Sequence, residues 1–170
     1  GHDKIDGLLP GHIEAVKASG VPVVWQCDGV HGNTVTAKSV SAAARPPRRR
    51  RRRHRRRRPR RRRPAPPPSR SPQVGLKTRA FDDVMSECTK ALAIHKAAGT
   101  TLAGVHLELT GQATVTECLG GSAKIDEAGL KVNYETYCDP RLNYSQAIEA
   151  AFTLANAIGA KAPAAKKAKK

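Results

Sequence analysis

The chain has 170 residues, an apolar content of 39% and a net charge of +17 at pH 7. This length is enough for one domain with a hydrophobic core. Sixteen of the positive charges are arginines between residues 45 and 70, which leaves a net charge of +1 on the other 144 residues. The basic character is therefore local and does not by itself make the whole chain a nucleic-acid-binding protein.

The cysteines and the apolar runs limit the cellular environment. Four cysteines are widely spaced and form no CxxC pair, so we expect a reducing compartment rather than a disulfide scaffold. No stretch approaches the roughly 18 consecutive apolar residues of a membrane span, so we expect no membrane partner. The chain starts at Gly1 without Met or a transit-peptide composition, which we interpret as the start of a fragment or a processed or tag-derived end.

Two helix–strand pairs are predicted in chain order. Residues 8–20 have helical spacing of apolar positions with Gly20 as a stop signal, and residues 21–27 form a short apolar run. Such a run is typical of a strand that is buried on both faces. The same pattern recurs as a predicted helix over residues 81–99 and a second buried strand over residues 102–109.

The remainder of the chain predicts a long loop and a closing helix. Residues 110–142 are rich in Gly and Thr, and residues 144–159 form an apolar helix with Asn143 as its N-cap. Alternating helices and strands predict parallel strands covered by helices. Two strands are too few for a stable parallel sheet, so we predict an α/β fold that forms the last two βα units of a (β/α)₈ barrel.

Residues 37–74 interrupt this pattern with long Arg and Pro runs. Adjacent guanidinium groups repel one another and prolines stop helices, so we predict a disordered insertion. The barrel part then occupies residues 1–36 and 75–159, and residues 160–170 form a Lys/Ala-rich tail. A misread intron or a frame error in GC-rich DNA is an alternative origin of the insertion.

Three polar side chains lie where a barrel carries its active site, at or after the strand ends. His31 follows the first predicted strand, Glu108 lies at the end of the second, and Asp139 precedes the last helix. One imidazole and two carboxylates suit a divalent ion such as Mn²⁺. The residues alone also permit a surface histidine with two loop or helix-cap carboxylates.

Several motifs resemble the class II DAHP synthase family, in its order and, apart from the insertion, at its spacing. The resemblance covers about residues 5–36 and 75–159. The motifs are VVWQCD-x-x-HGNT (residues 23–34), GLKTRAFDD (75–83), GVHLELTGQ (104–112), VTECLGG (115–121) and CDPRLN (138–143).

The resemblance implies a reaction and a ligand set. The family condenses phosphoenolpyruvate with erythrose 4-phosphate and releases phosphate, which opens the shikimate pathway to chorismate and the aromatic amino acids. The His of HGNT, the Glu of HLELTG and the Asp of CDPRLN are family ligands of a divalent metal. The expected ligands here are therefore His31, Glu108 and Asp139. Mn²⁺ is the expected ion, with Co²⁺ or another divalent ion as alternatives.

Three cations lie in these motifs. Lys77 and Arg79 of the KTR sequence are candidates for contacts with the substrate phosphates, and the alternative is a solvated pair at a helix start. For Arg141 an ion pair that fixes the loop is favoured over a substrate contact.

Other residues beside the proposed site are expected to be structural. We expect His106 to be packed and hydrogen-bonded, and Trp25 to belong to the core. Cys27 and Cys138 are expected to be small buried residues.

The chain departs from the family in three places. The family has Pro-Met where this chain has Gly29-Val30, which we expect to loosen the turn that aims His31. About 35 additional residues separate His31 from Lys77, although loop closure costs only about 0.6 kcal/mol per doubling of length. The family's fourth ligand, an upstream Cys, is absent together with the upstream cations that bind phosphoenolpyruvate. We therefore expect the 170-residue chain to be inactive alone.

Two other functions compete with the synthase. The Arg run predicts non-specific nucleic-acid binding through phosphate neutralisation. A truncated paralogue without catalysis is the third interpretation. The resemblance also implies a homo-oligomer at full length, and a plastid location if the protein is from a plant or alga, otherwise a cytoplasmic one.

Overall fold

The computed structural model describes residues 1–37 and 75–159. Of the predicted disordered insertion, 37–74, residues 38–74 lie outside the described residues, as does the predicted tail. Ala37 is described, and it is buried. The elements in chain order are α1 (Ile5–Ser19), β1 (Trp25–Asp28), the 3₁₀ helix η1 (His31–Asn33), β2 (Thr34–Thr36), β3 (Lys77–Arg79), α2 (Phe81–Ala97), β4 (Leu102–His106), the 3₁₀ helix η2 (Gly129–Lys131) and α3 (Tyr144–Ile158).

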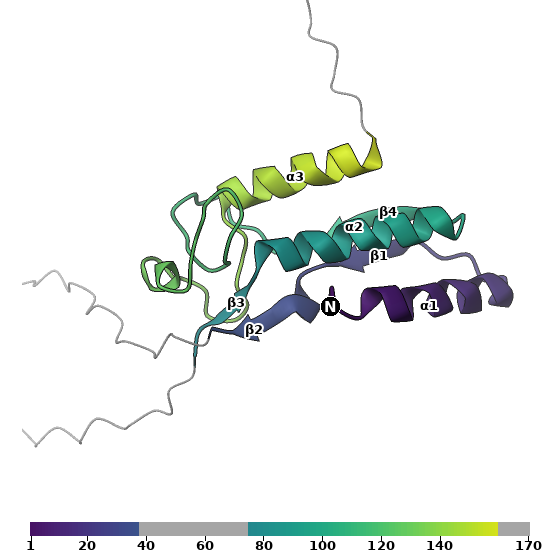
Figure 1. Cartoon of the computed structure of the whole chain (residues 1–170), viewed down its shortest axis with the longest axis horizontal. Coiled ribbons are helices and arrows are strands. Elements are labelled where there is room, and N and C mark those ends of the chain that lie inside the picture. The colour runs from purple at the N-terminus through teal and green to yellow at the C-terminus, as the bar shows by residue number, and fades with distance from the viewer. Residues whose placement is uncertain (38–74, 160–170) are drawn as a thin grey trace, which may run out of the picture.

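Helix α2 is the centre of the arrangement. Figure 1 shows it between α1 and α3, with β1 and β4 behind it, and it contacts all four elements. Strands β1 and β4 are parallel neighbours, with Cys27 opposite Val105 and Asp28 opposite His106. The predicted α/β class with parallel strands is therefore confirmed. In the described residues, no helix is long and apolar enough to span a membrane.

The three predicted helices are confirmed, with shifts of a few residues at their ends. Helix α1 starts earlier than expected, at Ile5, and ends before Gly20, whose left-handed φ of 69° suits glycine. Helix α2 buries one face, including Phe81, Val84 and Cys88. Cys88 packs against Cys27 of β1, so the apolar stripe of α2 joins the helix to the sheet.

Each predicted strand is longer at one end than the observed strand. The expectation that both faces of these strands are buried is wrong. The run 21–27 becomes a strand only at Trp25, and Val23 and Val24 are 46% and 79% exposed. Strand β4 ends at His106, and Leu109 makes only an isolated bridge to Leu142. Within the described residues β1 pairs only with β4. Val23 and Val24, which precede the paired segment, are therefore exposed.

The two faces of the β1–β4 sheet differ in polarity. Cys27 and Val105 face the helices and belong to a hydrophobic cluster. The alternating positions Gln26, Asp28 and His106 are exposed. The polar side chains of the sheet therefore gather on the face away from α2, at the end where the strands finish.

A second, antiparallel ribbon was not predicted. Strands β2 and β3 pair with Thr34 opposite Arg79 and Thr36 opposite Lys77. The amide of Ala37 donates to the carbonyl of Leu76 over 2.9 Å, which extends the ribbon to the edge of the described residues. This ribbon places the KTR sequence next to the residues that follow His31.

The predicted N-cap of the last helix is confirmed as a capping box. The Asn143 side chain accepts from the amide of Gln146 at 3.0 Å, and the Gln146 side chain accepts from the amide of Asn143 at 3.1 Å. The amide groups of the same two side chains donate to the carbonyls of Val115 and Cys118. One box therefore caps α3 and ties it to the long loop.

We expect Asn143→Ala to lower the free energy of unfolding by about 1 to 2 kcal/mol, because it removes the cap and a buried donor together. Asn156→Ala, an exposed change within the same helix, is the matched control and should change it by less than about 0.5 kcal/mol. Urea unfolding followed by circular dichroism measures both. Equal effects of the two substitutions would contradict the capping role.

Candidate metal centre

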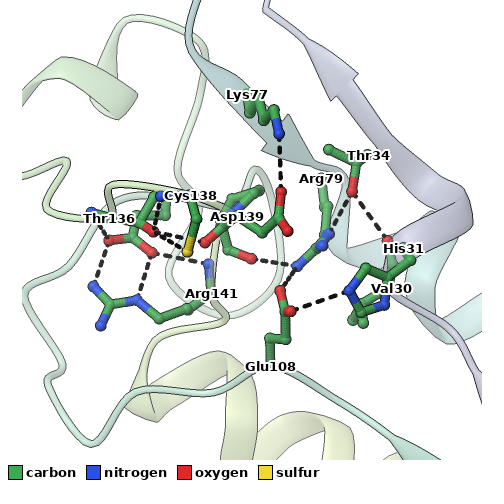
Figure 2. Close-up of polar contacts among 12 residues, drawn as sticks. Val30, His31, Thr34, Lys77, Arg79, Glu108, Thr136, Cys138, Asp139 and Arg141 are labelled. Carbon is green, nitrogen blue, oxygen red and sulfur yellow. Dashed lines mark hydrogen bonds and ion pairs between the residues drawn. The ribbon is translucent and has the colours of Figure 1, made fainter.

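The structure brings the three sequence-predicted ligands together. Ligand atoms of His31, Glu108 and Asp139 all lie within 4.8 Å of one another. His31 comes from η1, Glu108 follows β4, and Asp139 lies in the loop before α3. In Figure 2 the three side chains converge from separate segments of the ribbon. The convergence predicted from strand ends is therefore observed, although none of the three lies within a strand.

An Asp28-centred turn aims His31. The Asp28 Oδ1 atom accepts from the amides of Val30 and His31, each at 3.1 Å, and Oδ2 lies 2.7 Å from His31 Nδ1. Partial burial raises the pKa of Asp28, but these hydrogen bonds outweigh it and hold the pKa below its usual value. An ionised carboxylate only accepts, so His31 Nδ1 donates to Asp28, and Nε2 is the ring nitrogen that faces Glu108.

The Gly29-Val30 departure has a structural counterpart in Cys88. A Cβ on Gly29 would lie 2.5 Å from Cys88 Sγ and 3.1 Å from the carbonyl oxygen of Val84. Val30 is fully buried. The Asp28 hydrogen bonds and close packing on α2 both support this turn, and the loosening expected from Gly29 stays a prediction.

Glu108 is held between two partners. Its Oε1 lies 3.3 Å from His31 Nε2, and its Oε2 lies 2.5 Å from Arg79 Nη1. Arg79 is fully buried, so it is not the solvated residue of the alternative interpretation. The same Nη1 donates to the carbonyl of Pro140, and Nε donates to Thr34 Oγ1 over 2.8 Å.

Lys77 and Asp139 form an ion pair at the open side of the centre. Lys77 Nζ lies 3.1 Å from Asp139 Oδ1, and the two side chains are 55% and 33% exposed. The hydrogen bond from Lys77 lowers the pKa of Asp139 below its usual value. Unlike Arg79, Lys77 has a mobile stem and solvent around its charge, so it can exchange this carboxylate for another anion.

Arg141 fixes the long loop, as favoured from the sequence. Its Nε and Nη2 atoms donate to the fully buried Glu117 over 2.9 and 2.6 Å, and its own amide donates to Glu117 over 2.9 Å. The amides of Glu135 and Thr136 also donate to this carboxylate. Burial raises the pKa of Glu117, but the contacts with Arg141 outweigh it and lower the pKa overall. This pair anchors the segment that carries Asp139.

Expectations for the neighbouring residues are partly wrong. His106 is exposed, and its ring stacks on that of His31 with 5.8 Å between centroids, so it is not packed in the interior. Cys27 is buried as expected, whereas Cys138 is exposed, because it lies in the loop outside the core. Trp25 packs its ring against the buried His95, which agrees with a place at the core.

Comparison with known proteins decides the family. The family model described as the class-II DAHP synthetase family matches residues 1–46 and 68–155. The chain belongs to this family. It is 44% identical over 158 residues to the phospho-2-dehydro-3-deoxyheptonate aldolase of Neurospora crassa, 39% identical over 155 residues to that of Streptomyces coelicolor, and 37% identical over 158 residues to that of Mycolicibacterium smegmatis.

These matches cover nearly all of this chain and a quarter of its relatives. They span 92%, 91% and 93% of the chain, in the order given above, but only 25%, 26% and 26% of the relatives. The family match leaves out residues 47–67, which contain most of the Arg run. The class-II DAHP synthetase motifs therefore lie on both sides of a segment that the family model does not include.

Sequence reasoning did not identify two supports of the centre. Asp28 lies three residues before His31. An Asp side chain often accepts from the backbone amides two and three residues later, so Asp28 could have been predicted to form this turn. Glu117 lies inside the VTECLGG motif, but a buried glutamate has no periodic signature. The sequence shows only that Glu117 precedes Cys118 and Leu119, which does not indicate burial.

We expect Gly29→Ala to cost about 1 to 3 kcal/mol of stability, because the new methyl group overlaps Cys88 Sγ. The cost should fall in a Cys88→Ala background, where the sulfur is gone. A double-mutant cycle by urea unfolding measures the coupling. Gly111→Ala, with no atom within 4 Å of its added Cβ, is the control. Additivity within about 0.5 kcal/mol would contradict the contact.

We expect acid to weaken the Glu117–Arg141 anchor. The folded pKa of Glu117 lies below its ordinary value of 4.5, so its stabilisation is complete above 4.5 and is lost as the pH falls through the lowered pKa. Glu117→Gln should cost about 2 to 3 kcal/mol at pH 7, below the range for fully buried pairs, because Arg141 is 32% exposed.

The measurement is the free energy of unfolding from pH 3 to pH 7 for wild type, Glu117→Gln and the exposed control Glu14→Gln. The Glu117 variant should show a flatter loss toward low pH than the other two. A slope equal to that of wild type would refute the assignment.

Proposed function

We propose that this chain forms the metal-ligand part of a DAHP synthase, a phospho-2-dehydro-3-deoxyheptonate aldolase that joins phosphoenolpyruvate to erythrose 4-phosphate. The observation that carries the proposal is the convergence of His31, Glu108 and Asp139, the three residues that the family motifs predict as ligands. The fold supports it as well. In a (β/α)₈ barrel the active site lies at the carboxyl ends of the strands, where Asp28 and His106 lie here, so these elements would be the last two units of such a barrel.

The residues present fit a divalent metal. The donor set is one imidazole nitrogen and two carboxylates, which suits Mn²⁺ and related ions. The 3.3 Å between His31 Nε2 and Glu108 Oε1 is near the roughly 3 Å that separates adjacent ligands of a six-coordinate ion. Asp28 engages His31 Nδ1, so Nε2, which faces Glu108, is the ring nitrogen that would bind the metal. When bound, the metal supplies Lewis-acid polarisation of the sugar aldehyde.

The chain's own side chains orient these ligands and receive the substrate charge. Arg79 holds one Glu108 oxygen, which leaves the other directed at His31. Lys77 lies on the open side and is the better placed of the two KTR cations to leave its carboxylate for a substrate phosphate. For Arg79, such a contact stays a prediction, because two of its nitrogens already donate to protein acceptors.

A chimaera tests the function directly. The matched quarter of the Neurospora crassa relative is replaced by this chain, and phosphoenolpyruvate consumption is measured with erythrose 4-phosphate and Mn²⁺. We expect activity, with a loss of at least about 100-fold in Glu108→Gln, since a ligand should matter no less than the supporting residues around it. The matched control Asp82→Asn removes an equal charge from the exposed first turn of α2 and should retain activity.

Two results would count against the proposal. A folded chimaera without activity would show that this chain does not replace the relative's segment. Equal activity in Glu108→Gln and in the control would remove the ligand assignment.

A further inference from the structure

We propose that Arg79 is the positioning residue of this centre, and that one buried guanidinium fixes all three ligand-bearing segments. This inference rests on the proposed function. Arg79 lies at the end of β3, and its side chain is only 1% exposed. Burying a guanidinium costs free energy unless its donors are paired, so the groups that pair with Arg79 indicate its role.

Each side-chain hydrogen bond of Arg79 reaches a proposed ligand or a segment that carries one. Nη1 donates to Glu108 itself and to the carbonyl of Pro140, the residue after Asp139. Nε donates to Thr34 Oγ1, and Thr34 directly follows the 3₁₀ helix that contains His31. Figure 2 shows the Arg79 side chain between the three segments, with dashed lines to each.

The planar guanidinium makes this joint rigid. Its nitrogens lie in a fixed fork, so the directions to Thr34, Glu108 and Pro140 cannot vary independently. A lysine at this position would keep the charge but not the fork. Among the buried side-chain atoms in the described residues, Arg79 Nη2 is the one without a hydrogen-bond partner. The protein contacts therefore use Nε and Nη1 and leave the two N–H groups of Nη2 without a partner in the described part of the chain.

Lys77 provides a comparison inside the same strand. Both cations pair with a ligand carboxylate, but Lys77 is 55% exposed and contacts Asp139 alone in this group. If either cation acted only through its charge, removing it would strengthen the binding of a divalent ion, because repulsion falls. If Arg79 positions the ligands, its removal weakens binding despite that electrostatic gain. The sign of the change therefore separates the two roles.

The test titrates Mn²⁺ alone into the 170-residue chain and measures free Mn²⁺ by electron paramagnetic resonance. We expect Arg79→Gln and Arg79→Lys to weaken binding by about tenfold or more. Lys77→Gln should bind as tightly as wild type or tighter. Thr34→Val, which removes the acceptor of Nε together with the hydroxyl's bond to the Val30 carbonyl, should give a smaller loss in the same direction. Unchanged or tighter binding in Arg79→Gln would overturn the inference.

A second measurement needs no metal. In the metal-free chain, nuclear Overhauser contacts between the stacked rings of His31 and His106 report the position of His31. We expect them to weaken in Arg79→Lys and Thr34→Val and to persist in Lys77→Gln, with circular dichroism unchanged in all three. Persistence in every variant would overturn the inference. If wild type takes up no Mn²⁺, the ring contacts alone decide the role of Arg79, and the chimaera tests the proposed function separately.

Discussion

The candidate centre depends on three converging side chains that no α-helix or strand positions. His31 lies in a single 3₁₀ turn, and Glu108 and Asp139 lie in loops, so backbone hydrogen bonding alone does not fix their separation. The buried guanidinium of Arg79 supplies that constraint, because it bonds to the segments around all three. Position 79 is in turn set by β3, which pairs with β2 immediately after His31. The antiparallel ribbon is thus the base on which the ligand geometry is built.

A second buried charge supports the same arrangement from the other side. Glu117 is fully buried and collects donors from Arg141 and from the amides of residues 135 and 136. A carboxylate with this many donors ties several segments of the long loop together. It acts beside a small hydrophobic cluster around Leu130 in the same loop, and its contacts with Arg141 and Thr136 hold the segment that carries Asp139.

The sequence was informative where local patterns are strong. Apolar spacing predicted α1, α2 and α3, and Asn143 was a readable cap because its side chain acts on the residues that follow it. The three ligands could be grouped because parallel strands end on one side, and because the family motifs marked the same residues. These signals are local or repeat a known pattern.

What could not be predicted depends on partners distant in the chain. The ribbon joins the short sequences TVT and KTR across about forty residues, and neither has an alternating pattern long enough to indicate a strand. Arg79 and Glu117 are charged residues, which are normally exposed. Their burial is explained only by the partners that the fold brings to each of them. Strand ends were misplaced because pairing, not the apolar run, determines where a strand begins.

The ribbon also affects how this protein accommodates sequence change. The amide of Ala37 and the carbonyl of Leu76 are hydrogen-bonded, so the backbone leaves and re-enters the described fold at neighbouring positions. Any polypeptide joining those two positions has to close the same short gap, whatever its length or composition, and the paired strands β2 and β3 separate that gap from His31. Evolution can lengthen or recode the chain at this point without moving a ligand. The same property makes the tip of the ribbon a natural place to graft a reporter or an affinity peptide.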